Sequence, residues 1–75
     1  MDILFTTAVI INGQSKSYNV SFADEAYIFT PDSQDNAPTF KLRRVHDEWK
    51  LDGELTEISK QQASAALESY LLSQH

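Results

Sequence analysis

The stretch "AVIINGQSKSYNV", residues 8–20, decides the fold of this chain, because two turn-forming residues stand between two runs with strand character. Asn12 and Gly13 both tolerate the positive backbone angle φ that a two-residue hairpin turn requires. Such a turn pairs Ile11 with Gln14. We therefore expect an antiparallel hairpin whose register can be counted outward from this pair.

Counting outward sorts the side chains of this hairpin into two faces. It pairs Thr7 with Tyr18, Phe5 with Val20, and Ile3 with Phe22. One face then collects the large apolar side chains and is expected to form the core: Ile3, Phe5, Val9, Ile11, Tyr18, Val20 and Phe22. The opposite face is mostly polar and is expected to be in contact with water.

A second turn is expected at Asp24 and Glu25, followed by a third strand. This turn places Tyr27 opposite Phe22 and Phe29 opposite Val20, on the same apolar face. The segment "PDSQDNAP", residues 31–38, has a proline at each end and is expected to be a surface loop.

The segment "TFKLRRVHDEWKLDG", residues 39–53, predicts a further hairpin with its tip at Asp47 and Glu48. Its core face would carry Phe40, Leu42, Trp49 and Leu51. In this register His46 lies opposite Trp49 and Arg44 points inward. We therefore expect either a bulge near Arg43 or an edge position from which Arg44 reaches solvent.

The period of the pattern changes from residue 59, where a helix is expected. Ser59 and Gln62 have the spacing of a capping box, and Ile58 and Ala63 suit a hydrophobic staple. Thr56 is a competing cap that would start the helix earlier. The residues with helical spacing that would face the core are Ala63, Ala66, Leu67, Tyr70 and Leu71.

Together these elements predict an α+β fold: an antiparallel meander of four to five strands with one C-terminal helix packed on one face. With 75 residues, the chain, residues 1–75, is expected to be a single small domain. A ligand pocket of about 300 to 1,000 Å³ would consume much of the apolar material of so short a chain, so a non-catalytic protein is favoured over an enzyme.

Charge and composition bear on the partners. The net charge of −5 and the pI near 4.7 argue against a nucleic-acid partner. The longest apolar run, "AVII", has four residues, which argues against a membrane partner or span. The absence of cysteine and of a basic leader segment leads us to expect a cytoplasmic location.

The quartet "HDEW", residues 46–49, is the candidate for chemistry, because it supplies an imidazole and two carboxylates. Neighbouring side chains of a strand point to opposite faces, however, so His46 and Asp47 converge on one ion only if the backbone turns there. We interpret the quartet as a hairpin tip and expect no cofactor and no resident metal. The alternative is a minor enzyme or metal-dependent site at His46, Asp47 and Glu48, with Arg44 as an anion-binding group.

The favoured hypothesis is a small non-catalytic interaction module that binds an unknown protein partner or forms a homodimer. Apolar residues on the face that the helix leaves uncovered, Leu4, Ala8, Ile10 and Ile28, suggest one binding surface. Basic residues on the outer face of the fourth and fifth strands suggest another, or a charged edge strand that discourages aggregation. The candidate interaction residues are Leu4, Ile10, Ile28, Lys41, Arg43 and Lys50.

Overall fold

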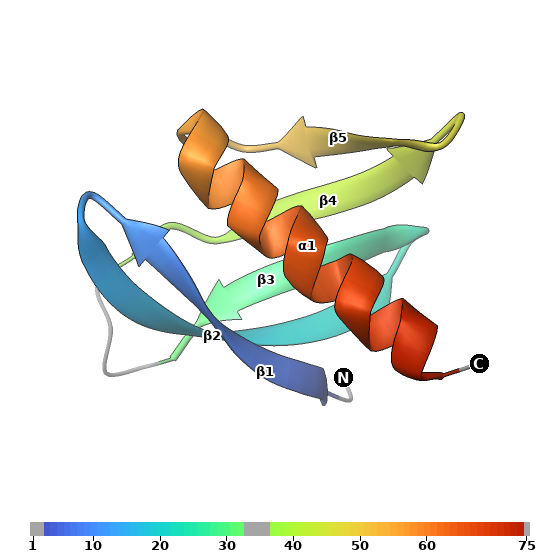
Figure 1. Cartoon of the computed structure of the whole chain (residues 1–75), viewed down its shortest axis with the longest axis horizontal. Coiled ribbons are helices and arrows are strands. Elements are labelled where there is room, and N and C mark those ends of the chain that lie inside the picture. Colours follow the sequence, from blue (N-terminus) through green and yellow to red (C-terminus); the bar gives the residue numbers. More distant parts are fainter. Residues whose placement is uncertain (1–2, 33–36, 75) are drawn as a thin grey trace.

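The computed structural model describes residues 3–32 and 37–74 and shows the expected α+β fold, a five-stranded antiparallel sheet with one C-terminal helix (Figure 1). The elements follow in the order β1 (Ile3–Ile11), β2 (Gln14–Ala23), β3 (Ala26–Pro31), β4 (Phe40–Val45), β5 (Glu48–Asp52) and α1 (Glu57–Ser73). The strands have the same order in the sheet as in the chain, so β1 and β5 are its edges. The central residues of the predicted loop 31–38 lie outside the described residues.

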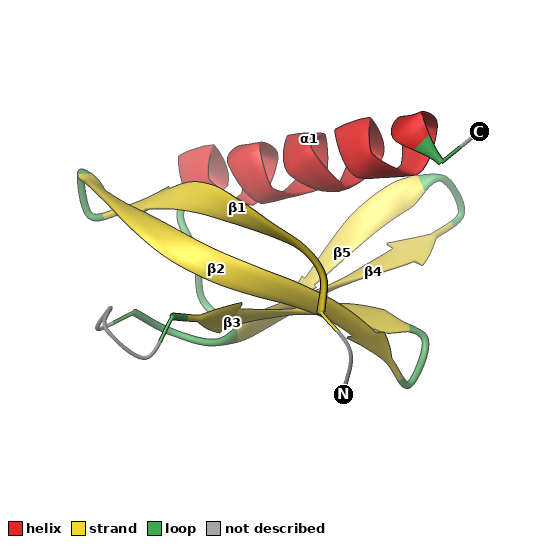
Figure 2. Cartoon of the chain, turned by 90° about the horizontal axis from the view of Figure 1, so that it is seen from below, coloured by secondary structure: helices red, strands yellow, loops and turns green. Residues whose placement is uncertain are grey.

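The helix α1 crosses one face of the sheet diagonally and leaves the other face uncovered (Figures 1 and 2). The core lies between the two layers and consists of Val9, Tyr18, Val20, Phe29, Phe40, Leu42, Ala63 and Leu67. All of these sheet residues belong to the face that the sequence pattern assigned to the core. Burying each of the larger side chains stabilises the fold by about 1.5 to 3 kcal/mol.

Aromatic contacts join the layers. The Phe5 ring on β1 stacks on Tyr70 of α1 with 4.5 Å between centroids, and Phe29 stacks on Phe40 at 4.7 Å. The buried Tyr18 hydroxyl donates a hydrogen bond of 2.7 Å to the carbonyl of Pro38. A large aromatic side chain is therefore accommodated in the core without leaving its polar atom unpaired.

Three two-residue turns connect the hairpins. Both central residues have positive φ in each of them: Asn12 and Gly13, Asp24 and Glu25, His46 and Asp47. This is the type I′ geometry, whose twist matches that of paired strands. Only the first turn has glycine at its second position, so the other two hold a residue with a side chain in a backbone conformation that costs about 1 to 2 kcal/mol.

The predicted register of the first three strands is confirmed except at one end. Ile11 pairs with Gln14, Thr7 with Tyr18, Phe5 with Val20, Phe22 with Tyr27, and Val20 with Phe29. The expected pair of Ile3 with Phe22 is wrong, because the register shifts between Ile3 and Phe5 and Ile3 pairs with Ser21. Counting from a turn assumes one residue per ladder position, and an extra residue on one strand breaks that assumption. Ile3 and Phe22 are 56% and 51% exposed as a result.

The tip of the β4–β5 hairpin lies one residue earlier than predicted. Because His46 and Asp47 form the turn, Val45 pairs with Glu48, and Arg44 rather than His46 pairs with Trp49. The change moves each partner by two positions, so side chains keep their predicted faces. No bulge occurs near Arg43, since the pairing runs without a shift from Lys41 to Val45. Arg44 is exposed because it is one residue from the end of its strand.

The helix begins with the competing cap. Thr56 is the N-cap residue, and its hydroxyl accepts a hydrogen bond of 3.2 Å from the Ser59 amide. The expected capping box at Ser59 and the staple at Ile58 are therefore wrong, and Ile58 is 66% exposed. The earlier start turns Ser59 toward the sheet, where it is 2% exposed.

Candidate interaction surface

The residues predicted to form an interaction surface lie on four strands of the sheet. Leu4 and Ile10 are on β1, Ile28 is on β3, Lys41 and Arg43 are on β4, and Lys50 is on β5. Strand alternation places Ile28, Lys41, Arg43 and Lys50 on the side away from α1, which we call the helix-free face. The expected pairing of Ile28 with Ser21 is present, and Ile28 also pairs with Lys41.

The apolar members of this set are spread out. Leu4 is 37% exposed and Ile10 is 40% exposed, while Ile28 is half-buried between Ser21 and Lys41. Leu4 and Ile10 are six positions apart on one strand, which corresponds to about 20 Å. Leu4 and Ile10 are therefore well separated from each other, and single exposed apolar residues are ordinary on protein surfaces.

The basic members lie close to carboxylates, which alternate with Lys50 along β5. Lys41 on β4 pairs with Asp52 on β5, and Arg43 pairs with Lys50. The Lys50 Nζ atom lies 3.2 Å from the Glu48 carboxylate on the same strand, with both side chains well exposed. Of these two strands, β5 is at an edge of the sheet and β4 is not, because β4 is paired on both sides. The outer surface of the β4–β5 hairpin is therefore a mixed-charge surface with both signs at close spacing.

The quartet at residues 46–49 is divided between a turn and the start of β5. His46 and Asp47 are the exposed turn residues, Glu48 begins β5, and Trp49 points to the helix side of the sheet. Within residues 3–32 and 37–74, no group of three histidine, cysteine or acidic side chains is arranged to hold a metal ion.

A cluster that sequence reasoning missed lies on the inner side of the same hairpin. The Trp49 Nε1 atom donates a 3.2 Å hydrogen bond to the Glu68 carboxylate of α1, and the Arg44 guanidinium lies 5.2 Å from the Trp49 ring centroid. The Arg44 Nη1 atom lies 4.0 Å from the Glu68 Oε1 atom. The inward position of Arg44 was the available signal, but nothing in the helical pattern indicated that Glu68 would meet it.

Next to this cluster is an open cavity of about 310 Å³, lined by Arg44, Glu68, Leu71 and Leu72. Leu72 is 75% exposed, so the cavity is a shallow groove at the C-terminal end of α1. Its charged groups already contact each other, and it contains no nucleophile beside a base.

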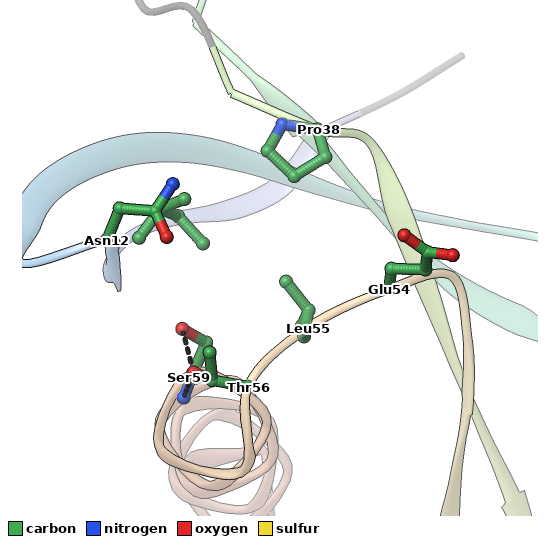
Figure 3. Close-up of a pocket in the computed structure, with 7 residues that line it drawn as sticks. Asn12, Pro38, Glu54, Leu55, Thr56 and Ser59 are labelled. Carbon is green, nitrogen blue, oxygen red and sulfur yellow. Dashed lines mark hydrogen bonds between the residues drawn. The ribbon is translucent and has the colours of Figure 1, made fainter.

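A second open cavity of about 320 Å³ lies at the opposite end of α1, between the β1–β2 turn and the segment that leads into the helix (Figure 3). Asn12, Pro38, Glu54 and Leu55 are among its lining residues. The hydroxyls at its helix side are engaged, because Thr56 donates to Ser59 and Ser59 donates to the carbonyl of Ile10. This cavity also lacks a catalytic arrangement.

The end of the β1 edge next to the β1–β2 turn is bonded to the helix. In a hairpin closed by Ile11 and Gln14, the amide and carbonyl of Ile10 point away from β2. The Ile10 amide donates a 2.8 Å hydrogen bond to the Gln62 side chain, and its carbonyl accepts one from Ser59. The two outward backbone groups of Ile10 are therefore satisfied by side chains of α1, whereas those of Ala8 and Thr6 further along β1 have no hydrogen-bond partner among the described residues.

The edge at β5 is open. The β4–β5 hairpin is closed by Val45 and Glu48, so by the same alternation Trp49 and Leu51 direct their amides and carbonyls away from β4. No group among the described residues forms a hydrogen bond with these outward atoms. Figure 1 shows β5 at the border of the sheet opposite β1. β5 thus offers a short row of free backbone donors and acceptors.

Comparison of the chain with protein-family models, curated proteins and solved structures finds no match. No helix in the described part of the chain has the length and apolar character needed to cross a membrane. The structure is therefore a helix-backed sheet in which the turn end of β1 is bonded to α1 and the outward groups of β5 are open among the described residues.

Proposed function

We propose that this chain is a small non-catalytic interaction module of the cytoplasm that binds a protein partner by pairing a strand of that partner with the open edge of β5. The single observation that carries the proposal is the row of unbonded outward backbone groups on β5, in contrast to the bonded groups of Ile10 on β1. Ile10 on β1 has partners for both outward groups, whereas Trp49 and Leu51 on β5 have none among the described residues. An exposed sheet edge is a general template for strand addition.

The side chains around β5 support a protein partner. Trp49 and Leu51 offer half-buried apolar surface on the helix side of the strand, while Lys50 offers a charge on the helix-free face, close to Lys41 and Arg43. Strand addition obtains affinity from main-chain hydrogen bonds and selectivity from alternating side chains. No observation favours the alternative site at His46, Asp47 and Glu48.

The proposal is tested with extended peptides selected for binding from a random display library. Nuclear magnetic resonance then maps which amides of the chain shift when a selected peptide is added. We expect the largest shifts at Trp49 and Leu51 and little change at Ile10, whose amide is already bonded.

A matched pair of variants isolates the backbone contribution. Leu51→Pro removes an outward amide that takes no part in the β4–β5 ladder, and proline is tolerated at such edge positions. Leu51→Ala also removes the leucine side chain beyond Cβ but keeps the amide. We expect Leu51→Pro to abolish peptide binding and Leu51→Ala to weaken it only partly, with circular dichroism verifying that both fold. Shifts confined to another surface, or binding that survives Leu51→Pro, would contradict the proposal.

A further inference from the structure

We infer that the strand that pairs with β5 is the β5 strand of a second copy of this chain, in an antiparallel register with Leu51 opposite Leu51 of the other copy. This inference rests on the proposed strand-binding function and names its partner. It follows from the order of charges along the edge, which reads Glu48, Trp49, Lys50, Leu51, Asp52.

Two-fold symmetry limits the possible registers. Two identical antiparallel strands related by a two-fold axis place one residue opposite itself, and the residues on either side then face each other. Side chains that face each other lie on the same side of the joined sheet. The axis can therefore pass through Trp49, Lys50 or Leu51 of the five-residue strand with both neighbours still on β5.

The charges exclude the central register. An axis at Lys50 places the two Lys50 side chains opposite each other and sets Glu48 against Asp52 twice, so every charged pair is repulsive. An axis at Trp49 sets Glu48 against Lys50 twice, and an axis at Leu51 sets Lys50 against Asp52 twice. In both of these registers, the charged side chains that face each other have opposite signs and attract.

The contacts within one chain favour the axis at Leu51. The Glu48 carboxylate already lies 3.2 Å from Lys50 of its own strand, whereas Asp52 has no ion pair with any described residue. The Leu51 register therefore uses a carboxylate that is still uncommitted. The backbone beyond the strand does not separate the two registers, because the axis at Trp49 sets Asp47, with φ of 65°, opposite Leu51, and the axis at Leu51 sets Gly53, with φ of 136°, opposite Trp49.

The Leu51 register also suits the apolar side of the strand. Leu51 is half-buried, and its side chain lies on the same face as the core residue Leu42, with which it pairs. Placing two Leu51 side chains together at the axis removes their remaining apolar surface from water. Trp49, by contrast, is already in contact with Tyr27, Arg44 and Glu68 of its own chain.

Sedimentation equilibrium on the full chain, at physiological ionic strength to screen the repulsion between two chains of net charge −5, measures the association. We expect a concentration-dependent dimer. Lys50→Glu and Asp52→Lys each make both charged pairs repulsive, so each variant alone should raise the dissociation constant by about tenfold or more.

Mixing the two variants is the decisive step. A heterodimer of Lys50→Glu with Asp52→Lys contains only attractive pairs, so the mixture should recover dimers that neither variant forms alone. Glu48→Lys is the matched control, because residue 48 faces residue 50 only in the Trp49 register. Recovery with Glu48→Lys instead of Asp52→Lys would overturn the Leu51 register. Circular dichroism of each variant excludes loss of the fold as the cause.

Amide hydrogen exchange separates this inference from the proposed function. On dimerisation, we expect slower exchange at Leu51 and no change at Ile10. A chain that stays monomeric at all concentrations, yet still binds selected peptides at Trp49 and Leu51, would overturn self-pairing and leave the strand-binding function standing. A dimer whose affinity is unchanged by the substitutions in β5, and whose amide exchange at Leu51 does not slow, would overturn both.

Discussion

The two edges of the sheet have the same ladder geometry and different surroundings. On β1, the outward amide and carbonyl of Ile10 bond to Gln62 and Ser59 of the helix. On β5, the corresponding groups of Trp49 and Leu51 have no partner among the described residues. The difference arises because α1 crosses the sheet diagonally, and its first turns lie against the β1–β2 hairpin (Figures 1 and 2). The helix therefore bonds the turn end of one edge, at Ile10, and leaves the outward backbone groups of β5 without a partner among the described residues.

The largest effect on stability is expected from removing a buried side chain that packs α1 against the sheet. Leu67 is fully buried in α1, and Leu67→Ala should lower the free energy of unfolding by about 2 to 5 kcal/mol because it removes buried methyl groups and leaves a cavity. Leu72→Ala on the same helix is the control, since Leu72 is 75% exposed. Chemical denaturation measures both, and equal losses would show that the helix is not anchored by its buried face.

A smaller loss is expected from opening the β1 edge itself. Ser59→Ala leaves the Ile10 carbonyl without its side-chain donor, in a part of the molecule where Ser59 is 2% exposed. The cost of an unsatisfied buried acceptor is about 1 to 3 kcal/mol. The exposed Ser69→Ala serves as the comparison in the same urea titration. If both serine variants unfold at the same urea concentration, the edge is not stabilised by this bond.

The β5 hairpin can be made more stable through its turn. Asp47 has φ of 65°, so Asp47→Gly should raise the free energy of unfolding by about 1 kcal/mol by relieving backbone strain. Gly13→Ala should lower the free energy of unfolding, because Gly13 has φ of 79°, where a residue with a Cβ atom is strained. The added Cβ would meet no atom within 4 Å, so the loss would come from the backbone angle and not from a clash. Thermal unfolding measures both changes, and a stabilising Gly13→Ala would refute the assignment of strain to these turns.

The smallest effect is expected at the charges of the open edge. Glu48 and Lys50 form a well-exposed pair, so Glu48→Gln should change the unfolding free energy of the monomer by less than about 0.5 kcal/mol. The free energies of unfolding of the variant and the original chain are measured at low and at high salt. The difference between them should be smaller at high salt. A substantially larger loss would mean that these charges support the fold of the monomer, which would weaken their assignment to partner binding.

Much of the fold was predictable because strand alternation and turn chemistry are local. Asn12 and Gly13 located the first hairpin, and the apolar alternation then placed Phe5, Val20 and Phe29 on one side of the sheet. The tip of the β4–β5 hairpin was predicted at residues 47–48 and lies at residues 46–47. This error did not change the assignment of faces, since it moves each strand partner by two positions. The shift at Ile3 was not predictable, because an extra residue in one strand leaves the polarity pattern almost unchanged.

The candidate surface was predictable only in part. Lys41, Arg43 and Lys50 were placed on the correct side of the sheet, but their pairing with Asp52 and with each other depends on the register of β4 and β5. The contact of Trp49 with Glu68 joins positions 19 residues apart on different layers, so no local pattern contains it.

The sequence by itself determined the order of the elements, the face of each strand that is buried and the helix that covers it, because these depend on the periods of two and 3.6 residues along the chain, while it left the number of strands at four to five. The tertiary structure alone decided which edge the helix bonds, at Ile10 of β1. That outcome depends on the angle at which α1 crosses the sheet, and this angle is set by the packing of side chains from every strand at once.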